Sequence, residues 1–434
     1  MKFGRSLGFL AALVSALCIG GLLSVAVTSK SYSESYPAVV CPPTLAGLTS
    51  QISLASKKTP FQRLQNRTTK TAPVKVLRLP VNKDSLLFSS DGVTPVVWQS
   101  RASSWAGGAV CTGPETSQWF VGGTADITTR GRLIIINSGL SDAVVDVQSF
   151  TENGKQPLRT ITVVSKNYQV IPTDSLAPGD KYLTVHVAPR SGRINAFMID
   201  EQGAGLKSLG GDLINSVSNA SKSVMIPAIP NQIKDRSPAL PHTLRVLTPG
   251  DVDASVTAEV MSSDGVFVPV GLTSRTVSAG IVTEFQFTPK ISSTVLAVRI
   301  TSTEPVVAAI KSTVTVAGRK DFVWSTSAPE LVPLTIAISG LTPLVSFVGE
   351  RINVSLDVTL TNGKVVRKTV KGTDIATWRA PDAARSFTIT KVGPDTFAGA
   401  LVSSVNGYGY FPIASGSLLT KIELPDSNIR VLNP

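Results

Sequence analysis

Cysteine and histidine are scarce in this chain of 434 residues, which has three cysteines and two histidines. Zinc sites need such residues at short spacings, whereas His186 and His242 are far apart in sequence and neither has a cysteine beside it. The sequence therefore predicts no metal and no cofactor.

Motifs of catalysis are missing as well. The Gly-x-Ser-x-Gly pattern around Ser6 lies in the N-terminal segment, where the strand–turn–helix context of a nucleophile cannot form. Neither histidine stands in a nucleophile–base motif. We therefore expect a protein that is not an enzyme. The sequence leaves open one alternative, a catalytic pair of carboxylates that come together only on folding.

Long helical patterns are also absent, except that residues 206–220 are compatible with a modest helix. Short runs rich in Val, Thr, Ser and Ile dominate instead, and Pro, Gly, Asn or Asp separates them about every 8 to 12 residues. This pattern is typical of antiparallel sheets, so it predicts an all-β fold.

One phrase occurs three times, an alternating apolar strand that ends on an Asn-Gly or Asp-Gly pair. The glycines of these pairs are Gly154, Gly265 and Gly363. Such pairs are strong hairpin signals, because both turn positions tolerate positive φ. The repeat period of about 90 to 110 residues matches a whole sandwich. We therefore expect tandem immunoglobulin-like antiparallel β-sandwich modules after an N-terminal transmembrane helix.

The repeats and the proline-containing stretches at 227–231 and 328–333 suggest five segments. They are a signal anchor (1–29), a basic extracytoplasmic stalk (30–83), a first β-sandwich with the tryptophan and cysteine segment (84–227), a second (228–330) and a third (331–434).

The compartment is indicated by the N-terminus. Residues 7–28 carry no charge and follow Lys2 and Arg5, so they are long enough to span a bilayer as a helix with its basic end in the cytoplasm. The alternative is a cleavable signal peptide, with small residues at 24–26 as its cleavage site. We expect a single-pass protein of the cell membrane with its C-terminal region outside the cytoplasm, or a secreted protein if the segment is cleaved.

Export determines the state of the cysteines. Cys18 lies in the apolar segment, and only Cys41 and Cys111 lie beyond it. An even pair in an oxidising compartment predicts one disulfide between them.

The expected stalk is basic, with no acidic residue between Glu34 and Asp84. It is either a polybasic segment attracted to anionic lipid or an anionic wall polymer, or a solvated linker. Because it is exported, its charge indicates envelope partners and no nucleic acid. The candidate contacts are Lys57, Lys58, Arg63, Arg67 and Lys70.

Trp98, Trp105 and Trp119 lie close together in sequence, near Cys111. They either pack around the disulfide as a core or form an exposed platform for sugar rings or a partner protein. We favour burial, since tryptophan is usually largely buried.

Several short motifs carry a resemblance: Cys41-Pro-Pro, Cys111-Thr-Gly-Pro, Trp119-Phe-Val-Gly-Gly and Leu133-Ile-Ile-Ile-Asn. They resemble an uncharacterised family of actinobacterial envelope proteins, secreted or with a single span, that is catalogued as a domain of unknown function. The resemblance implies residence in the cell envelope and brings no catalytic residue.

The sequence favours a membrane-anchored structural or interaction protein of the bacterial cell envelope, with an envelope protein as partner. The alternative is an accessory factor that binds a wall polysaccharide or a lipid-linked sugar for a membrane glycosyltransferase, with the tryptophan segment and the basic residues as its contacts.

Overall fold

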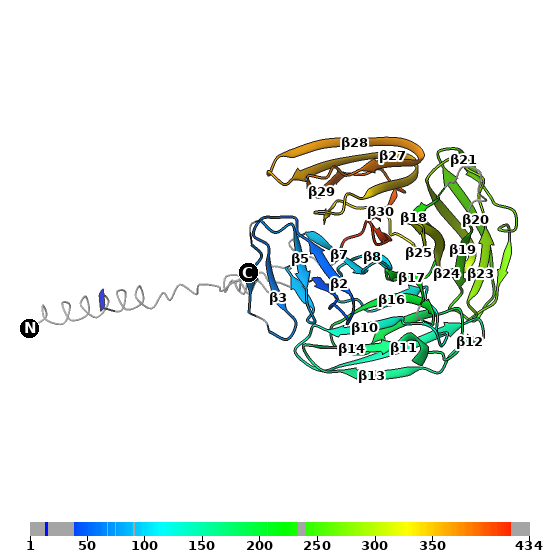
Figure 1. Ribbon diagram of the computed structural model, residues 1–434, viewed down its shortest axis with the longest axis horizontal. Coiled ribbons are helices and arrows are strands. Elements are labelled where there is room, and N and C mark those ends of the chain that lie inside the picture. Colours follow the sequence, from blue (N-terminus) through cyan, green and yellow to red (C-terminus); the bar gives the residue numbers. More distant parts are fainter. Residues whose placement is uncertain are drawn as a thin grey trace, which may run out of the picture. The chain divides into compact units, whose positions relative to one another are not determined.

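The computed structural model describes residues 14–15, 39–66, 68–73, 75–89, 92–205, 207–232 and 240–417 (Figure 1). Contacts divide the chain into one unit of Tyr36–Leu419 and a second of Met1–Ser35 with Thr420–Pro434. Apart from Val14 and Ser15, the expected signal anchor lies outside the described residues. No helix in the described ranges has the length and apolar character that crossing a bilayer requires.

The larger unit is built from antiparallel sheets, which confirms the predicted all-β class. Its first strands lie where the sequence predicted a stalk. Apolar side chains such as Ile52, Leu64 and Leu79 are buried there, and this burial gives the segment a core that a solvated linker lacks. These strands are β1 (Val39–Cys41), β2 (Thr49–Ser53), β3 (Pro60–Arg63), β4 (Lys70–Thr71), β5 (Arg78–Val81) and β6 (Leu86–Phe88).

Two sheets follow, with an apolar core between them. One has the order β14-β10-β16-β17, and the other has the order β12-β11-β15-β9, with β13 on β11. Val145 and Val185 of the second sheet pack in the same core as Leu133 and Ile135 of the first. The elements are β9 (Gln118–Val121), β10 (Arg132–Asn137), β11 (Ala143–Thr151), β12 (Gly154–Lys155), β13 (Arg159–Val163), β14 (Asn167–Pro172), the 3-10 turn η1 (Thr173–Ser175), β15 (Thr184–Pro189), β16 (Ile194–Ala204) and β17 (Lys207–Ile214).

The next eight strands form a single sheet, because the 22-residue strand β24 pairs with neighbours along its whole length. Its first part pairs with β18 and β20, and its last part pairs with β19 and β25. The strands are β18 (Ser221–Pro230), β19 (His242–Leu247), β20 (Ala254–Ser262), β21 (Gly265–Phe267), β22 (Arg275–Val277), β23 (Thr283–Phe287), β24 (Val295–Val316) and β25 (Arg319–Thr326).

The last sheet joins the two ends of the larger unit. Strand β26 pairs in parallel with β7, with Thr335 opposite Val93, so β2 and β5 extend the sheet of the last segment. Tandem immunoglobulin-like modules are therefore not confirmed, because segments far apart in sequence share this sheet. It contains β7 (Val93–Arg101), β8 (Trp105–Val110), β26 (Leu334–Ala337), β27 (Leu344–Leu360), β28 (Val365–Arg379), β29 (Ala384–Lys391), β30 (Phe397–Ser403) and β31 (Tyr408–Pro412).

The helix expected at residues 206–220 is wrong. Residues Lys207–Ile214 form β17, which pairs with β16. Gly210 and Gly211 lower the helical propensity of this segment, and the buried Leu213 and Ile214 are stabilised by strand packing.

The two stretches expected as linkers pack into sheets. Residues 227–230 belong to β18, and Pro227 lies where the register against β24 shifts, so its missing N–H interrupts no regular ladder. In the second stretch, the main-chain N–H of Leu331 donates to the carbonyl of Thr396 at 2.7 Å. The structure therefore places no free linker at either position.

The three predicted hairpin glycines have positive φ: 102° at Gly154, 124° at Gly265 and 89° at Gly363. The residue before each glycine does not, so the turns differ from the expected type, in which both central residues have positive φ. The hydroxyls of Thr151 and Ser262 bridge the first two turns, because each accepts from a turn N–H and donates to the carbonyl of the glycine.

Four hairpins each contribute one strand to a shared centre. They are β7–β8, β16–β17, β24–β25 and β30–β31, and their second strands contact one another in the closed order β8, β17, β25, β31 and back to β8. We call these four strands the hub, and Figure 1 shows β8, β17 and β25 lying together.

Candidate functional site

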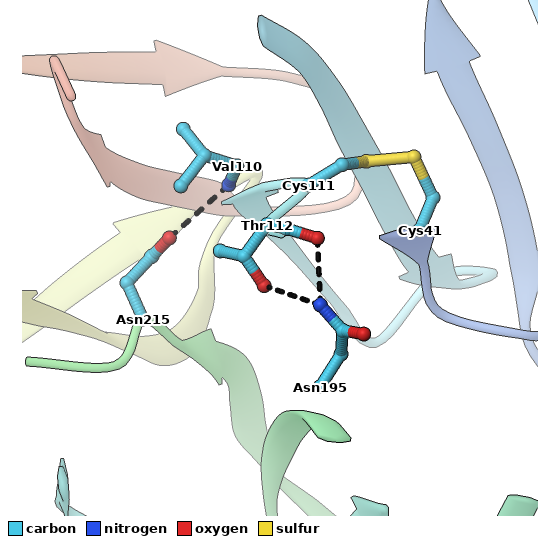
Figure 2. Close-up of a disulfide and its surroundings, with 6 residues drawn as sticks. All are labelled: Cys41, Val110, Cys111, Thr112, Asn195 and Asn215. Carbon is cyan, nitrogen blue, oxygen red and sulfur yellow. Dashed lines mark hydrogen bonds between the residues drawn. A yellow bond between two sulfur atoms is a disulfide. The ribbon is translucent and has the colours of Figure 1, made fainter. Parts of the chain in front are cut away.

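The predicted disulfide between Cys41 and Cys111 is present and fully buried. Cys41 ends β1, and Cys111 directly follows the hub strand β8, so the bond fixes the first strand of the larger unit to the hub (Figure 2). Main-chain hydrogen bonds between Val40 and Thr112, of 2.8 and 3.2 Å, run beside it.

Asparagine side chains continue this connection, as Figure 2 shows. The amide of Asn195 donates to the carbonyl of Thr112 at 2.7 Å. Asn215 accepts from the N–H of Val110 at 3.3 Å and donates to the carbonyls of Gly108 and Tyr410 at 3.0 and 2.9 Å. One buried side chain after β17 thereby bonds to β8 and β31.

The three tryptophans are buried, with exposed fractions of 7% for Trp98, 0% for Trp105 and 8% for Trp119. They belong to three different apolar cores, and only Trp105 shares a core with Cys111. None of them can present a ring face as a sugar-binding platform, and they do not surround the disulfide as one group.

Glycines let the hub strands approach closely. A Cβ atom on Gly409 would lie 2.6 Å from the main-chain nitrogen of Gly108, and one on Gly107 would lie 2.5 Å from Oδ1 of Asp212. A Cβ on Gly211 would lie 2.8 Å from Cδ2 of Trp105. Any side chain at these positions would therefore push two hub strands apart.

The side chains of buried aspartates accept hydrogen bonds from neighbouring hub strands. Oδ2 of Asp212 accepts from the N–H of Trp324 at 2.7 Å, and Oδ1 of Asp321 accepts from the N–H of Gly211 at 3.1 Å. Oδ2 of Asp200 accepts from the indole N–H of Trp324 at 2.8 Å. Within the described residues, Asp200 Oδ1 and Asp321 Oδ2 are buried and have no hydrogen-bond partner.

Burial raises the pKa of these acids. The pKa of Asp321 rises to about 7, mainly because burial disfavours its charged form. Burial also raises the pKa of Asp212, and the nearby Asp321 and Asp200 add to this rise. Protonated carboxyls in the hub avoid the cost of uncompensated buried charge.

Two cations lie against the ring of Trp324 beside this cluster. The Arg245 guanidinium lies 4.7 Å from the ring centre and forms an ion pair of 2.6 Å with Glu284. Lys311 Nζ lies 5.7 Å from the same ring and 3.1 Å from Oε1 of Gln202, and burial lowers its pKa. Arg245 and Lys311 belong to the eight-stranded sheet, and they reach across to the carbonyls of Gly123 and Leu183 and to Gln202, so they pack this sheet against the segment before it.

The chain also brings a serine to a histidine. Ser117 Oγ lies 3.0 Å from His186 Nε2, and it donates to the carbonyl of Ser218 at 2.9 Å. Because the only hydroxyl hydrogen points to that carbonyl, Nε2 must donate, and His186 is not placed to take the proton of Ser117. Burial lowers the pKa of His186 to about 4, and its ring stacks on Trp119 at 4.0 Å.

The other histidine is also packed inside. His242 is buried, its Nδ1 lies 2.9 Å from Ser312 Oγ, and its ring stacks on Phe287. In the described part of the chain, no three His, Cys, Asp or Glu side chains are grouped to hold a metal ion.

The candidate basic contacts lie apart from the hub. Lys57, Lys58 and Lys70 are exposed, Arg63 is half-buried, and Arg67 lies outside the described residues. The exposed lysines remain available to an anionic surface.

A cleft of about 420 Å³ opens between β24 and the hairpins β27–β28 and β30–β31. Arg379, Tyr408 and Ser403 line it together with apolar side chains, among them Leu344. Sequence reasoning missed this cleft and the hub, because both are assembled from strands that are distant in the chain. The only signal in the sequence was the pair of adjacent glycines in each of two hub strands, at 107–108 in β8 and at 210–211 in β17.

No curated protein matches the chain. A family model described as a family of unknown function (DUF5719) matches residues 99–375, which include three of the four hub strands. With more than half of its length matched, the chain belongs to the DUF5719 family of unknown function.

Proposed function

We propose that this protein is a non-enzymatic structural or interaction protein of the bacterial cell envelope, held to the membrane by residues 7–28. The hub carries the proposal. Side chains that could perform chemistry, including Asp212 and Asp321, are buried there and bond one strand to another. This use suits a rigid support better than a reaction site that must exchange substrate with solvent.

The disulfide supports the extracytoplasmic part of the proposal. Disulfides persist in oxidising compartments, and Cys41 and Cys111 are paired. The resemblance to actinobacterial envelope proteins points to the same location. The alternative, an accessory factor whose tryptophans and basic residues contact a sugar polymer, loses its tryptophan surface because those rings are buried, and it keeps only the exposed lysines.

The hairpin β27–β28 offers a surface for a protein partner. Strand β28 is 15 residues long, most of it is exposed, and among the described strands it pairs only with β27. Lys368 and Lys371 are exposed on it, and Arg367 pairs with Asp357 at 3.0 Å. Lysines on a free strand edge discourage pairing with another copy, so an acidic partner suits this edge better.

The test uses the tagged full chain in an actinobacterial envelope. A photo-crosslinking residue at Lys368 should capture an envelope protein, and the same residue at Leu140, which is 74% exposed between β10 and β11, should not. Extracellular protease should reach the tag in intact cells, and Lys371→Glu should reduce the crosslink. Recovery of the protein in the cytoplasm, or equal crosslinking at both positions, would contradict the proposal.

A further inference from the structure

The cleft between β24 and the last two hairpins has the dimensions of a ligand site. Its volume of about 420 Å³ lies in the usual range for small-molecule sites, roughly 300 to 1,000 Å³. The walls come from strands that the hub holds together, since β25 and β31 contact each other there and directly follow β24 and β30. The cleft is therefore formed before any ligand arrives.

Of the described residues that line the cleft, one is a cation, Arg379. The Arg379 side chain is exposed at the end of β28, and it forms no ion pair or hydrogen bond with another described residue. Guanidinium groups bind carboxylate or phosphate through two parallel hydrogen bonds. Among the described residues, no aspartate or glutamate lines the cleft to compete for Arg379. The charge of the site thus favours a ligand with one anionic group.

The remaining lining combines hydroxyl groups, the amides of Asn231 and Gln232, and apolar side chains. Thr294, Ser403 and Tyr408 contribute hydroxyl groups that have no hydrogen-bond partner among the described residues. Val295 and Leu401 also line the cleft and are buried. Hydroxyl groups both donate and accept, as sugar hydroxyls do, and the half-buried ring of Tyr408 can pack on the C–H face of a sugar.

We propose that this cleft binds a sugar ring carrying one anionic group, with the anion on Arg379 and the ring against Tyr408. The anionic group is the carboxylate of a uronic acid or the phosphate of a sugar phosphate. Partner binding at the edge of β28 does not depend on the cleft, so either proposal can fail alone.

The experiment titrates the purified full chain with four probes: glucuronic acid, glucose 6-phosphate, glucose and inorganic phosphate. Calorimetry and ligand-observed NMR should show that at least one anionic sugar binds at least tenfold more tightly than glucose and than inorganic phosphate. The tighter of the two anionic sugars identifies the carboxylate or the phosphate as the natural group. Equal affinity for glucose, equal affinity for inorganic phosphate, or no binding of either anionic sugar at millimolar concentration would overturn the proposal.

Two variants and a control place the ligand in the cleft. Arg379→Gln should weaken binding of the anionic sugar at least tenfold, and Ser403→Trp should block it by filling the cleft. Lys391→Gln removes one positive charge from the exposed end of β29 but does not line the cleft, so the affinity of this variant should stay within twofold. Unchanged binding in Arg379→Gln, or an equal loss in Lys391→Gln, would contradict the assignment.

Discussion

The carboxylate of Asp212 accepts a hydrogen bond of 2.7 Å from the main-chain N–H of Trp324, which lies 112 residues further along the chain. The other oxygen accepts from the N–H of Leu213 at 2.8 Å. A single buried side chain therefore provides partners for main-chain groups of two hub strands, β17 and β25. Regular strand pairing between these two strands is replaced there by a side-chain bridge.

Removal of this bridge should destabilise the protein. Asp212→Ala leaves two buried N–H groups without partners, so we expect the free energy of unfolding to fall by about 2 to 5 kcal/mol. Asp212→Asn keeps one acceptor oxygen and should lose less. Denaturant unfolding of the two variants beside the wild type measures both effects. An alanine variant within about 0.5 kcal/mol of the wild type would show that the bridge contributes little.

Glycine in the hub should be irreplaceable where the strands meet. Gly409→Ala would place its Cβ 2.6 Å from the nitrogen of Gly108, so we expect a loss of about 1 to 3 kcal/mol from forced separation of β31 and β8. Gly250→Ala is the matched control, because its Cβ would meet no atom within 4 Å and its φ is not positive. In thermal unfolding, Gly409→Ala should have a clearly lower melting temperature than Gly250→Ala. Similar melting temperatures would contradict close packing in the hub.

The raised pKa of Asp321 predicts a specific pH dependence. Its pKa is about 7 in the folded chain, above the ordinary aspartate value of 3.8, so the folded state binds the proton more tightly than the unfolded state. This contribution to stability is present below about pH 4 and is lost as the pH rises to about 7. Relative to the wild type, Asp321→Asn should therefore become progressively more stable across that range.

The difference between variant and wild type is the informative quantity, because other groups titrate as well. Glu115 also has a pKa of about 7, whereas His186 and His242, with pKa values of about 4, act in the opposite direction below pH 6.5. These contributions cancel in the difference. A difference that stays constant from pH 4 to 8 would show that Asp321 keeps an ordinary pKa.

The disulfide should stabilise the first strands against unfolding. It closes a loop of 70 residues, for which chain entropy gives about 4 kcal/mol. A Cys41→Ser and Cys111→Ser double variant should lose stability of this order in chemical denaturation. In the wild type, alkylation of the folded protein followed by mass spectrometry should find neither cysteine labelled. Labelling of both would contradict the pairing.

Local features of this fold could be predicted from sequence, whereas long-range pairings could not. Short stretches of sequence are enough to predict the strands, from their alternation, and the turn at Gly265. The disulfide could be predicted from the number of exported cysteines and the compartment. The parallel pairing of Thr335 with Val93 depends on residues at opposite ends of the larger unit. No pattern within a short stretch of sequence indicates a contact between such distant residues.

The predicted stalk and the two predicted linkers differ from the structure for a related reason. Basic charge and proline suggested exposed chain, yet Leu64 is buried beneath the basic surface, and Pro227 occupies an irregular position in a strand. The candidate cleft could not be predicted from the sequence either, because Arg379 and Tyr408 line it from different hairpins. Composition alone cannot distinguish an exposed stretch from the outer face of a short strand.

Hydrogen exchange of Gly409→Ala, followed by mass spectrometry, tests most directly whether the four hairpins share one hub. A shared hub predicts faster exchange in β8, β17 and β25 together with β31, because one displaced strand loosens all its neighbours. As a control, Gly265→Val, in the turn between β20 and β21, should speed exchange mainly in those two strands. Faster exchange confined to β27–β31 in Gly409→Ala would contradict the shared hub.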